Sequence, residues 1–395
     1  MKISVLGLGY IGLPTAIAFA LNGYEVCGYD TNKDVVDTLN RGKLHIIEKG
    51  LQEELTQVTE AGTFRAFDQL QETDVYIICV PTPFQKIERE KKADLSYVFS
   101  ATEKVAQNLK KGDLVILEST VPPYTTKKMT DMLCELSGLG RNEFYTAHCP
   151  ERVLPGRILH ELLHNDRIIG AEQKEAALKA KAIYESFLTT GKVYVTDDVT
   201  AEMCKLTENS FRDVNIAFAN ELSIICDELN IDVNELISLA NKHPRVNILS
   251  PGVGVGGHCI SVDPWFLIEQ FKDSAKVIAA ARNVNDHKPY FVVDKIEEKI
   301  HGSKDCVIAI LGLAFKADID DLRESPSVVL AKALMERGYT VIGCEPNTEL
   351  KEKDGIPIYS LDEALERSNL AVLTVKHRQF LEQLDKIKEK NHLIV

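Results

Sequence analysis

The chain has 395 residues, a length that fits two or three domains. Hydrophobic residues make up 45% and charged residues 27%, as in typical globular proteins, and no apolar run is long enough to predict a membrane-spanning helix. The 46 Lys and Arg against 59 Asp and Glu give a formal net charge of −13 at pH 7. Because so acidic a surface repels a phosphate backbone, nucleic acid is not expected as a partner, and neither is a membrane.

The N-terminus and the cysteines favour a cytoplasmic location. The strand-like KISVLG leads straight into a glycine motif, so the sequence shows no pattern of a cleavable secretory signal. The nine cysteines include no CxxC pair, which favours reduced thiols over a disulfide framework or a structural zinc site.

Residues 1–196 alternate short apolar runs with helical patterns. The runs ISVLG, EVCGYD, DVYIICV, DLVILEST and EFYTAHC are typical of buried strands. Such alternation predicts a parallel sheet covered by helices. This segment is the expected N-terminal domain.

Residues 197–300 are the expected middle domain. The stretch from Lys192 to His243 contains neither Gly nor Pro. Its apolar residues recur at helical spacing: Val214, Phe218, Leu222, Ile225 and Leu229. We expect one long helix here, which crosses between domains or pairs with a second subunit. A glycine-dense loop, SPGVGVGGHCISVDP, and further helical patterns follow.

Residues 301–395 return to alternating strands and helices. CVIAILG, YTVIGCEP and NLAVLTV predict strands. SPSVVLAKALMERG predicts a helix with Ser325 at its N-cap and Pro326 at its first position. The C-terminal segment is therefore expected to form a second α/β domain.

The first motif with chemical meaning is GLGYIG, with Gly7, Gly9 and Gly12, which lies between an expected strand and an expected helix. Glycines in such a turn let the backbone approach a pyrophosphate, which the helix N-terminus attracts. Asp30 ends the next expected strand, where a carboxylate binds ribose hydroxyls and repels a 2′-phosphate. The pattern predicts a dinucleotide site that favours NAD over NADP.

The second motif is the loop 251–263, with four glycines in six residues followed by Cys259. This cysteine is either a thiolate nucleophile, if a cation lies near, or a buried and inert thiol. Lys205, Asn209 and Arg212 share one face of the long helix. That face lines either a cleft, in which case it supplies the cation, or solvent.

These motifs resemble those of the UDP-glucose/GDP-mannose dehydrogenase family over essentially the whole chain. The resemblance rests, in order, on LGLGYIGLP, VPTP, EST, CPERVLPG, TAEMCKLTENSFRDVNIAFANEL, KHPRVN, GVGVGGHCISVDPWF and DDLRESP. It implies an α/β fold of two Rossmann-like doubly wound domains, joined by a long central helix and a small all-α middle domain. It also implies a homodimer through that helix, NAD as the cofactor, and oxidation of a UDP-sugar primary alcohol to a carboxylate.

The resemblance also implies roles for single residues. NAD contacts are expected at the glycine motif and at Tyr10, Ile11, Asp30, Thr82, Thr120 and Arg323. Substrate contacts are expected at Arg152, Val153, Lys205, Asn209, Arg212, His243, Arg245, Gly256, Phe315 and Lys316. Cys259 is the expected nucleophile and Lys205 the expected acid/base group. The expected catalytic set also contains Asn209, and Asp263 and Glu151 as acid/base or water-positioning residues.

The implied chemistry explains why a cysteine is needed. A single hydride transfer cannot convert an alcohol to an acid. A thiohemiacetal on Cys259 holds the aldehyde for a second hydride transfer, and water opens the resulting thioester. A cationic Lys205 stabilises both the alkoxide and the thiolate.

The expected substrate is UDP-N-acetyl-D-mannosamine, for surface polysaccharide biosynthesis. Val255, His258 and Val262 stand where relatives specific for UDP-glucose have phenylalanine, serine and lysine. A pocket that hydrogen-bonds an acetamido group discriminates against a sugar without one. The nearest alternative is the UDP-N-acetyl-D-glucosamine epimer. The others are a two-electron hydroxyacid dehydrogenase, which needs no cysteine, and an NAD-binding regulatory or scaffold protein.

Three further patterns suggest other chemistry. HELLH at residues 160–164 matches a zinc-protease motif, but Pro155 and Gly156 precede it and leave barely two helical turns, so no metal is expected. His258 and Cys259 are neighbours in a loop expected to be extended, where adjacent side chains point apart, so no Cys–His pair is expected. KIEREKK at residues 86–92 is expected to be a solvated loop.

Overall fold

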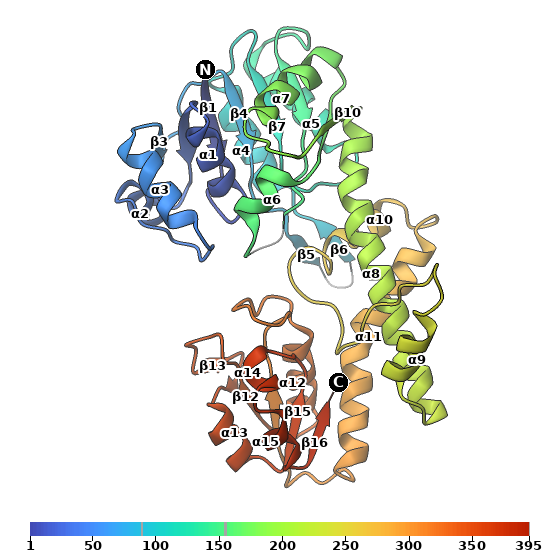
Figure 1. Cartoon of the computed structure of the whole chain (residues 1–395). Helices are drawn as coiled ribbons and strands as arrows, with labels where there is room; N and C mark the ends of the chain where they lie inside the picture. Colours follow the sequence, from blue (N-terminus) through green and yellow to red (C-terminus); the bar gives the residue numbers. More distant parts are fainter. Residues whose placement is uncertain (88–89, 154–155, 395) are drawn as a thin grey trace. The chain divides into compact units, whose positions relative to one another are not determined.

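The computed structural model describes residues 1–87, 90–153 and 156–394, which form two compact α/β units (Figure 1). The first unit is Met1–Thr207 and the second is Glu208–Val395. The α/β fold class is confirmed. The boundaries of the three domains, at residues 196 and 300, stay a prediction. No helix among the described residues is long and apolar enough to cross a membrane.

The first unit is built on an eight-stranded sheet. Its strands are β1 (Lys2–Leu6), β2 (Glu25–Tyr29), β3 (Phe64–Phe67), β4 (Val75–Ile78), β7 (Leu114–Leu117), β8 (Tyr145–His148), β9 (Arg167–Gly170) and β10 (Val193–Thr196). Their order is β10-β9-β8-β7-β4-β1-β2-β3, and all neighbours are parallel except β8 and β9. From β3 to β8 this is the Rossmann order, in which successive strands are added to one side of β1 and then, from β4 on, to its other side.

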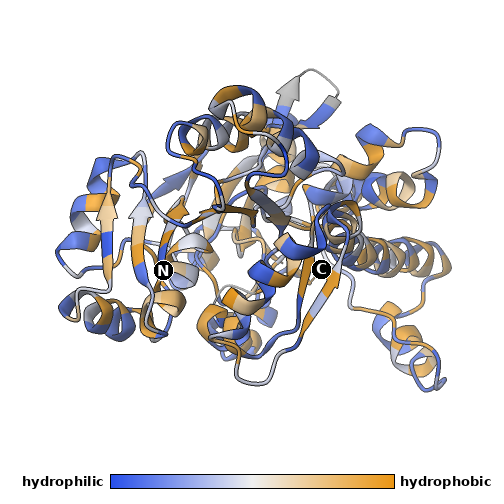
Figure 2. Cartoon of the chain, turned by 90° about the horizontal axis from the view of Figure 1, so that it is seen from above, coloured by the Kyte–Doolittle hydropathy of each residue, from blue (hydrophilic) through white to orange (hydrophobic). Residues whose placement is uncertain are grey.

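Helices cover both faces of this sheet. One core cluster contains residues of α1 (Gly12–Leu21), α2 (Lys33–Asn40), α3 (Leu51–Glu60) and α7 (Lys174–Glu185). The other contains residues of α4 (Ser96–Ala106) and α5 (Thr125–Ser137). In β4, Val75 and Ile77 enter the first cluster and Tyr76 and Ile78 the second. Because successive strand residues point to opposite faces, a continuous apolar run is required here. Figure 2 shows helices that carry both hydrophobic and hydrophilic residues.

The expectation of a loop over KIEREKK is wrong for its described residues. β5 (Phe84–Ile87) and β6 (Glu90–Ala93) form an antiparallel pair in which Phe84 faces Ala93. Glu88 and Arg89 lie outside the described residues. A run of charges indicates exposure to water, but an exposed hairpin satisfies its backbone through its own strands.

The second unit contains most of the long helix α8 (Asp198–Leu229), which has 32 residues and starts in the first unit. The next helices are α9 (Val233–Ala240), α10 (Asp263–Gln270) and α11 (Lys276–Lys299). A four-stranded parallel sheet has the order β12-β11-β15-β16. Its strands are β11 (Val307–Leu311), β12 (Thr340–Cys344), β15 (Leu370–Leu373) and β16 (His392–Ile394).

The remaining elements of the second unit complete its two core clusters. α12 (Pro326–Glu336) packs with α11 on one face of the sheet. The other face has apolar residues of α13 (Leu361–Arg367), α14 (Arg378–Leu381) and α15 (Leu384–Lys388). A short antiparallel pair, β13 (Glu352–Lys353) and β14 (Ile356–Pro357), lies beside β12.

Within the second unit, α8 buries polar residues and exposes apolar ones. Asp213 and Asn220 are buried and bond to α11: Arg282 donates to Asp213 at 2.6 Å, and Asn220 donates to Asn285 at 2.8 Å. Three bulky side chains seven residues apart are exposed: Phe211 (66%), Phe218 (52%) and Ile225 (43%). Residues seven apart lie on one side of a helix, so these side chains form an exposed apolar stripe.

Candidate active site

The glycine motif forms the turn between β1 and α1. Gly7 has a φ of 92°, which favours glycine, and a Cβ on Gly12 would lie 1.9 Å from the Gly7 carbonyl oxygen. A Cβ on Gly9 would meet nothing within 4 Å. The first and third glycines are therefore required by the turn itself. The second leaves open backbone that a pyrophosphate can approach at the start of α1, where Ile11 provides no side-chain cap.

Asp30 lies directly after β2, beside this turn. Its Oδ2 accepts a hydrogen bond from the Leu8 amide at 2.9 Å, and its Oδ1 accepts one from the Asn32 amide at 2.9 Å. The carboxylate is thus fixed next to GLGYIG while its residue stays partly exposed. The geometry fits the ribose of NAD.

Two more residues expected to contact NAD lie together after β4 and β7. Thr82 donates its hydroxyl to the Thr120 carbonyl oxygen at 2.7 Å, and both residues are half-buried. The half-buried Tyr10 completes the glycine turn. Arg323, the remaining expected contact, belongs to the second unit.

Cys259 is exposed, which is incompatible with the alternative of a buried thiol. Its carbonyl accepts from the Val262 amide at 3.0 Å and from the Asp263 amide at 2.8 Å, so the cysteine sits in the turn that starts α10. Asn209 donates to Asp263 at 2.5 Å, and both residues are buried. Three of the expected catalytic residues are thereby close to one another in the fold of the second unit.

The glycine loop before Cys259 packs against the segment that follows β11. A Cβ on Gly256 would lie 2.5 Å from the Glu324 carbonyl oxygen, and one on Gly257 would lie 2.8 Å from the Phe315 ring. The Gly257 amide donates to the Arg323 carbonyl oxygen at 3.2 Å. These glycines therefore serve close packing within the protein, in addition to any approach to a ligand. Gly256 and Phe315, both expected substrate contacts, are neighbours.

The expectation of an extended loop at His258 and Cys259 is wrong. Interactions with Asp321, whose Oδ2 lies 3.7 Å from Nδ1 of His258, and with the Cys259 side chain raise the pKa of His258 to about 9. The positive charge of Arg323, whose Nη2 lies 3.1 Å from Nδ1 of His258, opposes this rise. The residues around Cys259 form turns, so the alternation of an extended chain does not apply.

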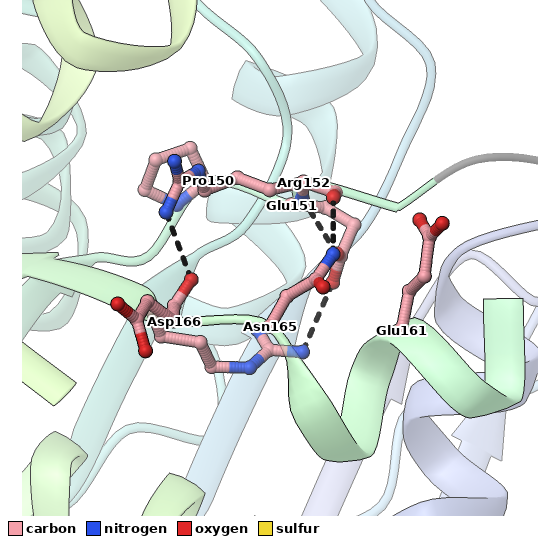
Figure 3. A pocket seen from close by; sticks show the side chains of 7 residues that line it. Pro150, Glu151, Arg152, Glu161, Asn165 and Asp166 are labelled. Atoms are coloured by element: carbon pink, nitrogen blue, oxygen red, sulfur yellow. Dashed lines mark hydrogen bonds and ion pairs between the residues drawn. The ribbon is translucent and has the colours of Figure 1, made fainter. Parts of the chain in front are cut away.

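In the first unit, Glu151 and Arg152 line a small pocket with Pro150, Glu161, Asn165, Asp166 and Arg167 (Figure 3). Arg152 donates to the Asp166 carbonyl oxygen at 2.9 Å, and Asn165 donates to the Arg152 carbonyl oxygen at 3.1 Å. Figure 3 shows these contacts holding the backbone after β8 against the segment that leads into β9. The half-buried Val153 follows, and Leu154 and Pro155 of CPERVLPG lie outside the described residues.

The other expected substrate residues are mostly accessible. Lys205 is half-buried on α8, and Arg212 on the same helix is exposed. Also exposed are His243, Arg245 and Lys316, and the Arg245 amide lies 3.3 Å from Nδ1 of His243. Long basic side chains with free heads suit contacts to a diphosphate.

The HELLH motif occupies the seven-residue helix α6 (Ile158–His164). The rings of His160 and His164 stack at 4.3 Å between centroids, and Nδ1 of His164 lies 2.7 Å from the His160 carbonyl oxygen. Among the described residues, no group of three His, Cys, Asp or Glu side chains is arranged to hold a metal ion.

Buried charged residues near the pocket of Figure 3 were not predicted from the sequence, among them Glu48, Glu118 and Arg167. Glu48 accepts from the amides of Gly156 and Ile158 at 2.8 and 3.0 Å and so fixes the start of α6. Arg167 forms ion pairs with Glu118 and with Glu151. The one available signal was a charged residue at the edge of an apolar run, as in DLVILEST and RIIG.

Comparison with known proteins identifies related chains over the full length. Models of the UDP-glucose/GDP-mannose dehydrogenase family match residues 1–188 (NAD binding domain), 199–287 (central domain) and 309–395 (UDP binding domain). The chain is 49% identical to a UDP-N-acetyl-D-mannosamine dehydrogenase from Campylobacter jejuni, covering 98% of each chain. It is 46% identical to an NDP-N-acetyl-D-galactosaminuronic acid dehydrogenase from Ralstonia nicotianae, covering 100% of this chain and 94% of that one.

Among solved structures, the UDP-D-ManNAc dehydrogenase from Pyrococcus horikoshii has a TM-score of 0.92 at 40% identity, covering 100% of this chain and 94% of that one. A UDP-N-acetyl-mannosamine dehydrogenase from Staphylococcus aureus has a TM-score of 0.89 at 39% identity, with 100% and 98% covered.

The Rossmann strand order, the glycine turn and its carboxylate define a dinucleotide-binding domain. The chain belongs to the UDP-glucose/GDP-mannose dehydrogenase family. It is an NAD-dependent UDP-sugar dehydrogenase, so the predictions of enzyme class and of NAD as the cofactor are confirmed.

Proposed function

We propose that the enzyme oxidises UDP-N-acetyl-D-mannosamine at C6 to UDP-N-acetyl-D-mannosaminuronate through a covalent intermediate on Cys259, in surface polysaccharide biosynthesis. The observation that carries the proposal is the exposed thiol at the start of α10, in a loop that Phe315 and the 323–326 segment hold in place. A nucleophile needs both access and a fixed position.

The residues divide the chemistry as follows. NAD, when bound, accepts a hydride in each of the two oxidations. Lys205 takes the proton of the C6 hydroxyl as the aldehyde forms, and the Cys259 thiolate adds to the aldehyde carbon. The charge of Lys205 stabilises the resulting oxyanion. After the second oxidation, Glu151 removes a proton from the water that attacks the thioester, and Cys259 leaves as thiolate. Asn209 holds Asp263 beside the nucleophile.

Substitution of the cysteine tests this mechanism. Cys259→Ala is expected to abolish formation of two NADH per sugar while NAD binding stays intact, because the glycine turn lies in the other unit. Cys259→Ser is expected to accumulate an ester on residue 259, detectable by mass spectrometry, because an oxygen ester opens more slowly than a thioester. The half-buried Cys306 is a control in the same unit, and Cys306→Ser should keep the wild-type stoichiometry. A Cys259→Ala enzyme that releases two NADH at the wild-type rate refutes the covalent route.

The acetamido sugar is supported by the relatives and by three residues. The Campylobacter, Pyrococcus and Staphylococcus relatives are named for N-acetylmannosamine, and the Ralstonia relative for an N-acetylgalactosamine derivative. Val255, His258 and Val262 stand where UDP-glucose enzymes carry other residues.

NADH release over a panel of UDP-sugars tests the substrate. UDP-N-acetylmannosamine is expected to give the highest kcat/KM, because a site that binds the acetamido group leaves polar groups unpaired with UDP-glucose. A higher value for UDP-glucose contradicts the proposal. A higher value for UDP-N-acetylglucosamine establishes the epimer instead.

We also propose that the protein is a homodimer whose subunits pair through α8. Each subunit then carries its own set of substrate-binding residues, including Lys205 and Arg212. The exposed stripe of Phe211, Phe218 and Ile225 supports it, because bulky apolar side chains gathered on one exposed side of a helix are typical of an interface. Phe218→Glu is expected to convert a dimer to monomers in sedimentation. Leu178→Glu, at an equally exposed leucine on α7, should leave the dimer intact. A monomeric wild-type protein refutes the interface.

A further inference from the structure

A buried ion-pair cluster includes two residues that line the pocket of Figure 3, Glu151 and Arg167, and the chemistry above leaves Arg167 and its second partner, Glu118, without a role. Arg167, the first residue of β9, places Nη1 3.2 Å from Oε1 of Glu118 and Nη2 3.1 Å from Oε2 of Glu151. The two carboxylates follow neighbouring strands, β7 and β8, and share this one guanidinium. Glu118 is 1% exposed and Glu151 is 8% exposed. With both carboxylates ionised, the cluster would hold a net negative charge away from water.

The groups around the cluster do not balance that charge. Burial raises the pKa of the Cys149 thiol to about 12, and it raises the pKa values of Cys79 and Tyr184 well above their usual ranges, so all three stay protonated and neutral. Burial also lowers the pKa of His148 to about 3, so this imidazole is neutral. The charge of the cluster is therefore set by Arg167 and its two carboxylates.

The hydrogen bonds differ between the two carboxylates. Glu151 accepts from the guanidinium through Oε2 and from the Arg152 amide, at 2.6 Å, through Oε1. Two N–H donors favour an ionised carboxylate. Glu118 has the guanidinium on one oxygen and only the thiol of Cys79, at 2.9 Å, on the other. A thiol is a weak donor, and burial raises the pKa of Glu118 to about 7.

We propose that Glu118 is a positioning residue that carries the one proton required by the buried pair, so that Glu151 stays ionised on the pocket side as the base for thioester opening. The inference rests on the role proposed above for Glu151. Of the two carboxylates, only that of Glu151 lines the pocket. Glu118 is connected to the pocket through its ion pair with Arg167.

The proton count through one turnover is consistent with this role. With a proton on Glu118, the cluster of Arg167, Glu118 and Glu151 is neutral. When Glu151 takes a proton from water, hydroxide attacks the thioester carbon and the Cys259 thiolate departs. The cluster then carries a net positive charge in a buried site, which favours release of the proton from Glu151 to solvent or to the thiolate.

Infrared spectroscopy of the full enzyme without substrate tests where the proton lies. A protonated carboxylic acid has a C=O stretch that a carboxylate lacks. Difference spectra over a range from about pH 5 to about pH 9 should show this band disappear with a midpoint near pH 7. Burial also raises the pKa of the Glu202 carboxyl to about 7, so the measurement uses the Glu202→Gln background, in which Glu118→Gln should remove the band. Glu48→Gln is the matched control, because Glu48 is a buried carboxylate of the same unit bonded to backbone amides outside the cluster.

A Glu202→Gln enzyme that lacks the band overturns the proposal, even if the further substitution Glu118→Gln does not fold. A band that survives Glu118→Gln in the Glu202→Gln background overturns it equally, because the proton is then on another residue. This measurement needs no substrate, so it is independent of whether the proposed sugar and the Cys259 intermediate are correct.

Single-turnover kinetics test the link to Glu151. Loss of the Glu118 proton near neutral pH adds a negative charge beside Glu151, so the rate of thioester opening should show an inflection near pH 7. Glu118→Gln should lose this inflection, and Glu48→Gln should keep it. A Glu118→Gln enzyme with the inflection unchanged overturns the positioning role. Failure of Glu151→Gln to accumulate the thioester counts instead against the proposed function of Glu151.

Discussion

In both units the first strand of the sheet is followed by a glycine turn whose backbone amide bonds to an acidic side chain, but the two turns have different roles. In the first unit, Gly7 follows β1 with a φ of 92°, and the Leu8 amide donates to Asp30 at 2.9 Å. In the second, Gly312 follows β11 with a φ of 100°, and the Leu313 amide donates to Glu345 at 2.8 Å. Each acid ends the second strand of its sheet.

The difference lies in what surrounds the acid. Glu345 is buried, and Nε2 of the fully buried His377 lies 3.1 Å from its Oε2. Although burial acts in the opposite direction, the hydrogen bond with His377 holds the pKa of Glu345 below its usual value. Asp30 stays partly exposed beside the open Gly9. In the first unit the acid of this turn is accessible, and the turn can bind a cofactor. In the second unit His377 covers the acid, and the turn has a structural role.

The largest effect is expected from breaking the open turn. In Gly12→Ala the new Cβ meets the Gly7 carbonyl oxygen at 1.9 Å, which should lower the free energy of unfolding by about 3 kcal/mol or more. In Gly9→Ala the Cβ meets no protein atom, so stability should change little while the KM for NAD rises. Urea unfolding and NAD titration separate the two. If Gly12→Ala and Gly9→Ala lowered the free energy of unfolding equally, the distinction between a glycine that the turn requires and a glycine that lets the cofactor approach would be wrong.

Much of this architecture follows from the sequence. The apolar runs place β1, β2, β4, β7 and β8, because a strand buried on both faces needs a continuous apolar run. Gly7, Gly9, Gly12 and Asp30 are predicted for the same kind of reason, since their roles are local. The hairpin β5 and β6 is not, because most of its residues are polar and its pairing is a backbone interaction.

Long-range polar contacts could not be predicted in this way. Arg167 and Glu118 are 49 residues apart, and neither strand pattern indicates that their side chains meet. The Asp213–Arg282 pair spans 69 residues, and it buries a charged side chain of α8 where a buried apolar side chain was expected. Periodicity identifies which residues share a face, but only the partner of that face decides whether it is buried.

The pH dependence of stability should differ between the units. Burial raises the pKa of Glu202, which accepts from the Tyr124 and Thr126 amides, to about 7. The folded state then binds this proton more tightly than the unfolded state, so the contribution of Glu202 falls as pH rises from about 4.5 to about 7, by about 3 kcal/mol in total. Glu345, with a lowered pKa, contributes stability that is lost as pH falls.

Urea unfolding across this pH range, followed separately for each unit, measures the difference. In Glu202→Gln, the free energy of unfolding of the first unit should fall less with rising pH than it does in the wild type. Glu345→Gln should weaken the second unit most at neutral pH and least in acid. A Glu202→Gln protein whose stability falls with pH as steeply as the wild type would show that this carboxyl is not the group being titrated.

The smallest effect, and the most direct test of the comparison, comes from neutralising each acid in turn. Asp30→Ala removes the acceptor of the Leu8 amide and the charge that faces the ribose, so binding of NAD should weaken by about 2 kcal/mol, roughly thirtyfold in KM. Discrimination against NADP should fall too, because the repulsion of a 2′-phosphate is lost. Glu345→Gln should leave the KM for NAD unchanged and lower the free energy of unfolding by about 1.5 kcal/mol, since the amide still accepts from Leu313 but pairs less well with His377. If Glu345→Gln instead raised the KM for NAD as much as Asp30→Ala, the closed turn would have to be reinterpreted as part of a ligand site.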